Sequence, residues 1–276
     1  MSEPLSLATL KYQLEKLQVR PSKKRGQNFI YVQTTIDKIA SLAEVNSIDH
    51  VLEIGPGLGA LSRSLAERAR LLTLVEIDSR LAAYLESVFE NYQPPVSIIN
   101  QDFLELKQIP ASINKCVSNL PYNLAVPIIL TLYERFAQIE ESCFLVQREQ
   151  AERLCAVPNT KLYGIPTLKL QYFASVKIVS QISRNVFYPR PHVDSTLIRV
   201  TRNSTSVLKK LPPYDQFAHL VDQSFKHRRK KIVNNLKPYY PEIETFLAEM
   251  GLSSDIRAEN LTFSQFIELT SLVASI

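Results

Sequence analysis

Four consecutive residues, Asn119, Leu120, Pro121 and Tyr122, carry groups that could bind a nucleobase. They follow the apolar run 115–118, and Pro121 favours an extended conformation at Leu120. The segment would therefore present an amide oxygen, backbone carbonyls and an aromatic ring at the end of a strand. An amide oxygen and a carbonyl can accept hydrogen bonds from an exocyclic amine, while the ring stacks on the base. An ordinary strand-to-helix turn with a buried tyrosine explains these four residues equally well.

A glycine-rich segment closes an earlier apolar run, 51–54. It contains Gly55, Gly57 and Gly59, which are three of the six glycines in the chain, so a plain turn is a poor explanation. Glycines at a helix N-terminus let the backbone approach a ligand closely. The spacing G-x-G-x-G lacks the third glycine of a dinucleotide fingerprint, and no Lys-Ser/Thr pair follows as in a phosphate-binding loop. The ligand therefore need not contain phosphate.

Two carboxylates follow the next two predicted strands. Glu76 could accept hydrogen bonds from both ribose hydroxyls of a nucleoside, and Asp102 from an adenine amino group, with Phe103 lining the ring. Either carboxylate alone could be a solvated strand end or a turn residue. In open α/β sheets, however, ligands bind at the carboxyl ends of the strands, where these residues and Asn119 would meet. A nucleoside without phosphates that carries a reactive sulfonium, S-adenosylmethionine, fits this set.

Strands and helices alternate through the first two thirds of the chain, which predicts an α/β fold with a doubly wound parallel sheet. The predicted strands are 51–54, 71–75, 96–99, 115–118 and 142–147, and the helices between them are 61–69, 79–89 and 124–136. The late strands 176–182 and 195–200 could form an antiparallel edge hairpin. After a polar linker at 203–213 the pattern is only helical, with helices at 214–225, 229–236, 241–250 and 263–273. We therefore expect one domain over 1–204 and a small all-helical domain over 205–276.

The chain is basic, with a formal net charge of +5, and its cations gather in two places. Charge runs are usually solvated faces. One run adjoins Gln27 and Asn28 and the other lies in the helical domain, which favours contact with RNA phosphates. The candidate RNA-binding residues are Lys23, Lys24, Arg25, Lys226, Arg228, Arg229 and Lys230.

The cysteines Cys116, Cys143 and Cys155 have no metal-ligand spacing, so we expect reduced thiols and no metal. The N-terminus lacks the features of a signal peptide, and no run approaches the roughly 20 apolar residues of a membrane helix. These features predict a cytoplasmic protein without membrane association.

Motifs along nearly the whole chain resemble one family, the ribosomal RNA adenine dimethyltransferases (the KsgA family), which have erythromycin-resistance rRNA methylases as relatives. The matching segments, in the family's order, are 24–29 (Lys-Arg-Gly-Gln-Asn-Phe), 53–59, 76–78, 101–102, 119–123 and 187–195. The chain departs from the family pattern at Ile30, at 124–126 (Leu-Ala-Val) and at His192.

The resemblance implies a Rossmann-like methyltransferase core, dependent on S-adenosylmethionine, with a small all-helical C-terminal domain. It implies transfer of methyl groups to N6 of two adjacent adenosines near the 3′ end of small-subunit (16S) rRNA, giving N6,N6-dimethyladenosine during small-subunit maturation. The partner would be rRNA in a pre-ribosomal 30S particle, and we expect a monomer.

The resemblance also assigns roles to single residues. Tyr122 and Phe187 would sandwich the target base, although Phe187 could instead be a core anchor. The implied catalytic residues are Asn119, Leu120, Pro121, Tyr122 and Phe187. The implied cofactor-binding residues are Asn28, Ile30, Gly55, Gly57, Glu76, Ile77, Asp102, Phe103 and Asn119.

Three alternatives stay open. A resistance methylase would act on large-subunit (23S) rRNA, and a DNA adenine methyltransferase shares the Asn-x-Pro-Tyr logic but usually has a DNA-reading domain. A non-catalytic assembly factor could retain the fold, against which the intact Gly55, Glu76, Asp102 and Asn119 argue.

Overall fold

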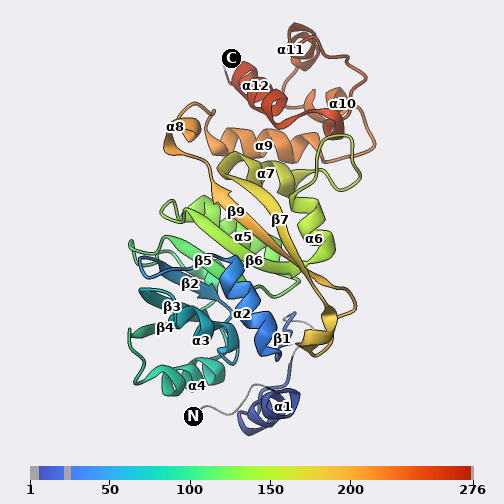
Figure 1. Cartoon of the computed structure of the whole chain (residues 1–276). Coiled ribbons are helices and arrows are strands. Elements are labelled where there is room, and N and C mark those ends of the chain that lie inside the picture. Colours follow the sequence, from blue (N-terminus) through green and yellow to red (C-terminus); the bar gives the residue numbers. More distant parts are fainter. Residues whose placement is uncertain (1–5, 22–25, 275–276) are drawn as a thin grey trace. The chain divides into compact units, whose positions relative to one another are not determined.

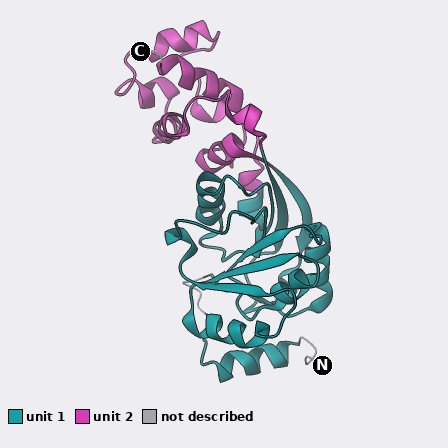
Figure 2. Ribbon diagram, turned by 90° about the vertical axis from the view of Figure 1, so that its left-hand side faces the viewer, with its two compact units in different colours: residues 1–151, 176–202 teal, residues 152–175, 203–276 magenta. Residues whose placement is uncertain are grey.

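The computed structural model of the chain describes residues 6–21 and 26–274, so the candidate RNA contacts Lys23, Lys24 and Arg25 lie outside the described residues. The chain divides into two compact units, residues 1–151 with 176–202, and residues 152–175 with 203–276 (Figure 2). The expected boundary, between 204 and 205, is close to the third and last point at which the chain passes between the units, at 202/203. Residues 152–175, for which the sequence predicted no element, belong to the second unit instead of the first.

The first unit is built on a mixed sheet whose strand order, within the described residues, is β4-β3-β2-β5-β6-β9-β7. Neighbouring strands from β4 to β6 are parallel, and β9 runs antiparallel to β6. The strands are β2 (His50–Ile54), β3 (Leu71–Glu76), β4 (Val96–Asn100), β5 (Lys115–Asn119), β6 (Glu141–Gln147), β7 (Ala174–Ile182) and β9 (Ser195–Arg202). This order confirms the predicted α/β sheet, and places β9 and β7 together at one edge.

Helices cover both faces of the sheet, with α2 in front and α5 behind (Figure 1). These helices are α2 (Gln33–Leu42), α3 (Ala60–Ala66), α4 (Ser79–Phe89) and α5 (Ala125–Arg135), and the short 3-10 helix η1 spans Phe103–Glu105. Ile36 and Ile39 of α2 pack with Leu65 of α3 and with Val51 and Leu72 of the sheet in one buried cluster. Apolar residues at helical spacing thus bury one face of each helix against the strands.

The N-terminal segment lies beside the carboxyl ends of the strands. Leu10 and Leu14 of α1 (Leu7–Lys16) are buried in a small cluster with Leu81 of α4. The short strand β1 (Phe29–Ile30) pairs antiparallel with β8 (Phe187–Tyr188), which follows the 3-10 helix η2 (Arg184–Val186). Strands of two residues carry no periodic signal, so the sequence did not predict this ribbon.

The second unit is helical within the described residues. Its helices are the second half of α6 (Arg148–Leu154), then α7 (Ile165–Phe173), α8 (Thr205–Leu208), α9 (Tyr214–Ser224), α10 (Ile232–Leu236), α11 (Ile243–Glu249), the 3-10 helix η3 (Ala258–Asn260) and α12 (Phe263–Val273). Aromatic residues join α7 to α9, with 5.2 Å between the ring centroids of Tyr172 and Phe217 and 4.5 Å between those of Phe173 and Tyr214. This packing explains why residues 152–175 group with the C-terminal helices.

Two details of the second unit differ from expectation. The predicted helix 229–236 begins only at Ile232, because the basic residues before it form a turn. The predicted linker at 203–213 contains the helical turn α8.

None of the helices in residues 6–21 and 26–274 combines the length and the apolar character that a membrane crossing requires.

Candidate functional site

A cavity of about 670 Å³ opens in the first unit where β2, β3 and β5 end. The register explains this position, because Ile54 pairs with Val75 and Leu52 with Cys116, so these strands end at one level. Of the predicted site residues, those that line the cavity are Asn28, Ile30, Gly55, Gly57, Glu76, Ile77, Asn119, Leu120 and Pro121. Asp102, Phe103, Tyr122 and Phe187 are not part of its lining.

The glycine loop forms one wall of the cavity. Gly57 has φ +61°, and a Cβ on it would lie 2.8 Å from Cε1 of Phe29, closer than carbon atoms approach without displacement. Glycine is therefore required at this position both by the left-handed backbone and by the ring of β1 that lies against it.

The carboxylate of Glu76 holds this loop in place. Its Oε2 accepts a hydrogen bond from the backbone N–H of Gly57 (3.1 Å), and its Oε1 accepts one from Asp78 N–H (3.0 Å). Burial raises the pKa of Glu76, and the two N–H donors oppose that shift because they stabilise the ionised form. The side chain predicted to bind ribose thus has a second task, which is to fix the cavity wall.

The two polar side-chain atoms of Asn119, at the end of β5, differ in their hydrogen bonding. Its Nδ2 donates to the backbone carbonyl of Asn28 (2.8 Å), which fixes the orientation of the amide. Its Oδ1 is buried and accepts no hydrogen bond from any described residue. Buried acceptors without a partner are uncommon in native proteins and costly, by about 1–3 kcal/mol. An acceptor left in this way on the wall of a cavity is an available site for a ligand N–H group.

The segment around Gly26 lies against the Asn-Leu-Pro-Tyr segment. A Cβ on Gly26 would lie 2.4 Å from Oδ1 of Asn123 and 2.9 Å from the backbone N of Tyr122. The close approach explains how two motifs almost a hundred residues apart form one wall.

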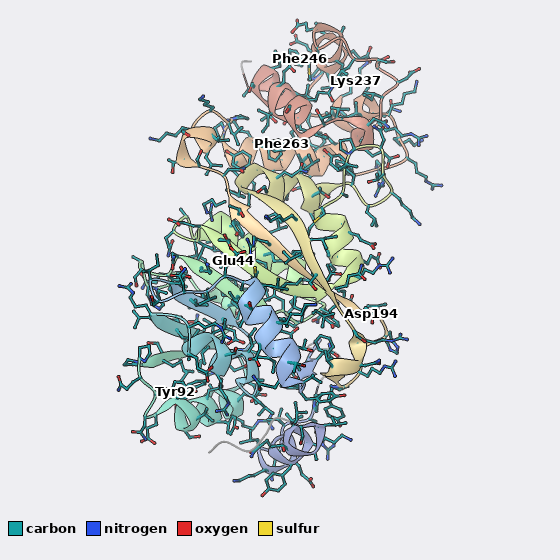
Figure 3. All side chains as sticks on the ribbon, in the orientation of Figure 1. Glu44, Tyr92, Asp194, Lys237, Phe246 and Phe263 are labelled. Carbon is teal, nitrogen blue, oxygen red and sulfur yellow. The ribbon has the colours of Figure 1, made fainter. Side chains whose placement is uncertain are left out.

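Tyr122 and Phe187 are buried rather than open to the cavity, with 6% and 2% of their surfaces exposed. The hydroxyl groups of Tyr122 and Ser195 are hydrogen-bonded to each other. The loop that carries Phe187 to Ser195 is held by Asp194, whose Oδ1 accepts from Arg184 N–H (2.9 Å) and whose carbonyl accepts from Arg148 N–H (3.2 Å). Figure 3 marks the position of Asp194. The proposed sandwich of these two rings around a base stays a prediction.

Asp102 and Phe103 turn toward the protein. The Oδ1 of Asp102 caps the 3-10 helix η1 by accepting from Leu104 N–H (2.9 Å), and the ring of Phe103 lies 5.9 Å from that of Phe136, centroid to centroid. Ile77, in contrast, is 53% exposed on the cavity wall and offers an apolar surface to a ring. The contact of Asp102 and Phe103 with adenine stays a prediction.

Several cavity residues are not among the residues predicted from the sequence. Glu53, the acidic residue of the glycine motif, lines the cavity although it is 2% exposed, and its Oε2 accepts from Ser62 Oγ (2.6 Å). Burial raises the pKa of Glu53 to about 8. The sequence feature that could have identified Glu53 is a charged residue within an otherwise apolar strand. Three further lining residues, Thr9, Leu10 and Gln13, come from α1, which no motif marked.

The basic turn at 225–230 belongs to the second unit. Lys226, Arg229 and Lys230 are exposed, whereas Arg228 is partly buried and pairs with Glu259, with 2.8 Å between Nε and Oε2.

The described part of the chain contains no group of three or more His, Cys, Asp or Glu side chains arranged to hold a metal ion.

The donor set fits a nucleoside that carries no phosphate. The glycine loop and Ile77 offer backbone and apolar surface, the buried carboxylate of Glu76 favours a neutral or cationic ligand, and Asn119 offers its unpaired acceptor.

Known structures confirm a Rossmann-like methyltransferase fold. A dimethyladenosine transferase from Plasmodium falciparum superposes with a TM-score of 0.74 over 87% of this chain and 95% of that chain, at 24% identity. The 23S rRNA methyltransferase ErmE superposes with a TM-score of 0.66 over 89% of this chain and 99% of that chain, at 27% identity.

Sequence comparison is more specific. A family model described as ribosomal RNA adenine dimethylase matches residues 19–275. A Streptomyces griseus protein named Ribosomal RNA small subunit methyltransferase A is 39% identical over 258 residues, which cover 91% of this chain and 88% of that protein. The chain belongs to the ribosomal RNA adenine dimethylase family.

The first prediction concerns Glu53 and pH. The folded protein holds this proton up to a pH of about 8, whereas an unfolded carboxyl group releases it near its ordinary pKa of 4.5, so Glu53 lowers stability as pH rises between these values. One proton bound only in the folded state makes the unfolding free energy fall by about 1.4 kcal/mol for each pH unit, and Glu53→Gln should remove this contribution to the slope. Urea unfolding at pH 5.5, 6.5 and 7.5, followed by far-UV circular dichroism, measures this slope. Glu86→Gln on the exposed face of α4 is the control, and an identical slope in both variants would contradict the prediction.

The second prediction concerns the cavity wall. Gly57→Ala should weaken binding of S-adenosylhomocysteine at least about tenfold, because the new methyl group displaces Phe29. Gly251→Ala is the matched control: its φ is +68°, but no atom lies within 4 Å of the position that its Cβ would take. Both variants incur roughly 1 kcal/mol of backbone strain, and only the first alters the cavity. Isothermal titration calorimetry measures the affinities, and equal losses would show that strain alone is responsible.

Proposed function

We propose that this protein transfers methyl groups from S-adenosylmethionine to N6 of two adjacent adenosines near the 3′ end of small-subunit rRNA, during maturation of the subunit in the cytoplasm. Membership of the ribosomal RNA adenine dimethylase family supports this proposal, as does the name of the Streptomyces griseus relative. The observation that carries it is the buried, unpaired Oδ1 of Asn119 on the wall of the cavity.

Asn28, Ile30, Gly55, Gly57, Glu76 and Ile77 would hold the methyl donor. When bound, S-adenosylmethionine supplies an electrophilic methyl group on a positively charged sulfur. The buried carboxylate of Glu76 suits a cation better than an anion, because its surroundings exclude the water that would screen a like charge.

The protein's contribution to the reaction is to orient the amine of the target base. The lone pair of adenine N6 is delocalised into the ring, so N6 is a weak nucleophile. Asn119 Oδ1 and the carbonyl of Leu120 would accept its two hydrogens, favour a pyramidal nitrogen and direct the lone pair toward the methyl carbon. A nitrogen–carbon bond forms, the carbon–sulfur bond breaks with its electron pair kept by sulfur, and the nitrogen then loses one proton to water.

The second transfer requires a different arrangement. A monomethylated amine has one hydrogen left, so one of the two acceptors loses its contact. Because Asn28 fixes the amide through Nδ2, Oδ1 stays in place for both transfers. We propose that Asn119 holds the remaining hydrogen, and that the first methyl group takes the position beside the Leu120 carbonyl.

The base must leave its stack to reach Asn119. Tyr122 and Phe187 would flank it after a shift from the buried positions that they occupy here, and Asp102 with Phe103 would contact the adenine of the donor. Lys226, Arg229 and Lys230 in the second unit would bind rRNA phosphates.

The decisive experiment presents radiolabelled S-adenosylmethionine with undermethylated small subunits and, separately, with large subunits. Label should enter only small-subunit rRNA, and nucleoside analysis should identify N6,N6-dimethyladenosine. Label in large-subunit rRNA would instead support the resistance-methylase alternative, and no label in either would support a non-catalytic assembly factor.

Asn119→Ala tests the assigned chemistry. Methyl transfer should fall at least about 100-fold, which is typical for the loss of one oriented polar group at a reacting centre. Binding of S-adenosylhomocysteine should fall less than about tenfold, since the glycine loop and Glu76 are unchanged. Asn91→Ala, at an exposed position after α4, should match the wild type in both assays. Full activity of Asn119→Ala would refute the assignment.

A further inference from the structure

Arg228 differs from its neighbours in the basic turn. The sequence alone groups it with Lys226, Arg229 and Lys230 as a phosphate contact. In the structure its side chain is 40% exposed, but its guanidinium is bonded to other groups of the protein, since Nε donates to Glu259 Oε2 (2.8 Å) and an Nη donates to the carbonyl of Thr160 (3.2 Å). A guanidinium that already makes these bonds has less capacity for an RNA phosphate.

The two partners of Arg228 belong to segments that are also joined to each other. The backbone N–H of Asn159 donates to the carbonyl of Glu259 (2.8 Å), and Nδ2 of Asn260 donates to Oδ1 of Asn159 (2.7 Å). Asn159 adopts φ +68°, a left-handed conformation that asparagine tolerates better than most residues. Loop 157–161, the basic turn and η3 are therefore held together in one clasp.

The basic turn is also fixed from within. Nδ2 of the buried Asn235 donates to the carbonyls of Ser224 (2.7 Å) and His227 (3.2 Å). With Arg228 holding one side and Asn235 the other, the backbone of the turn has a defined position although its cations point outward.

The clasp brings further cations beside the turn. Lys161 directly follows Thr160, and Arg257 lies two residues before Glu259. Both are exposed, and no carboxylate in the described part of the chain pairs with either of them. Exposed lysine and arginine side chains held on a fixed backbone lose less entropy when they bind phosphates.

We infer that Arg228 is a positioning residue for RNA binding, and that the clasp unites Lys161 and Arg257 with Lys226, Arg229 and Lys230 into one surface for the phosphate backbone of RNA. This inference rests on the proposed contact between the basic turn and rRNA. It adds two phosphate contacts that no motif indicated, and it assigns Glu259, an acidic residue, a favourable role in binding an anion.

The role assigned to Glu259 can be tested by whether its removal strengthens or weakens RNA binding. Glu259→Ala removes a negative charge, so simple electrostatics predicts tighter RNA binding. The clasp predicts the reverse, a loss of at least about threefold in affinity for undermethylated small subunits at about 0.1 M salt. Asp255→Ala is the matched control, because Asp255 also pairs with a lysine of this region, Lys231, but both side chains are largely exposed. Its affinity should be unchanged or tighter.

A double-mutant cycle completes the test. The losses of RNA affinity caused by Arg228→Ala and Glu259→Ala should not add, because each breaks the same clasp. The losses caused by Lys161→Ala and Arg229→Ala should add, and each of these two variants should lower the salt dependence of binding by about one phosphate contact. Circular dichroism checks that the variants fold. Tighter binding by Glu259→Ala, or additive losses for Arg228 and Glu259, would overturn the positioning role. Unchanged affinity when Arg229 and Lys230 are both replaced by Glu would overturn the RNA contact itself, and the clasp's function with it.

Discussion

The hydrogen bond from Asn119 Nδ2 to the carbonyl of Asn28 is the contact on which the site depends. An asparagine amide has a donor end and an acceptor end, and a free side chain could present either to a ligand. Here the donor end is bound by the protein, so only the acceptor end of this cavity-lining residue is left for a ligand. A site for an amine thus differs from a site for a carbonyl because of a backbone atom that lies some ninety residues earlier in the chain.

That arrangement depends in turn on the sheet and on two glycines. The sheet brings Gly55, Glu76 and Asn119 to one level because the parallel strands end together. Gly26 lets the N-terminal segment lie against Tyr122, and Gly57 lets the glycine loop lie against Phe29. The buried carboxylate of Glu76 is tolerated because it accepts two backbone N–H bonds, so a costly charge also orders the loop that contacts the ligand.

The sequence predicted the parts of the structure that repeat a simple pattern. Helix 79–89 and helix 263–273 were predicted with their observed bounds, because both have a strong apolar periodicity and a polar residue at the start. The motifs located Gly57, Glu76 and Asn119 in one cavity. The sequence left open whether Asp102 is a turn residue and whether Phe187 is a core anchor, and the structure has Asp102 capping η1 and Phe187 buried. The sequence could not reveal that Arg228 is paired with Glu259, because that contact depends on the folded arrangement of the chain. The membership of residues 152–175 in the second unit also depends on such contacts, between the rings of α7 and α9.

The ribbon of β1 and β8 has a consequence for the order of events during synthesis. Ile30 pairs with Phe187, so the strand that follows Asn28 gains its partner only after 157 further residues have been added. At elongation rates of about 5–20 residues per second, the wait is roughly 8–30 s. Until then the segment that orients Asn119 lacks its neighbouring strand. A nascent chain that already contains the glycine loop, Glu76 and Asn119 would therefore still lack this ribbon until the ribosome has nearly completed the first unit.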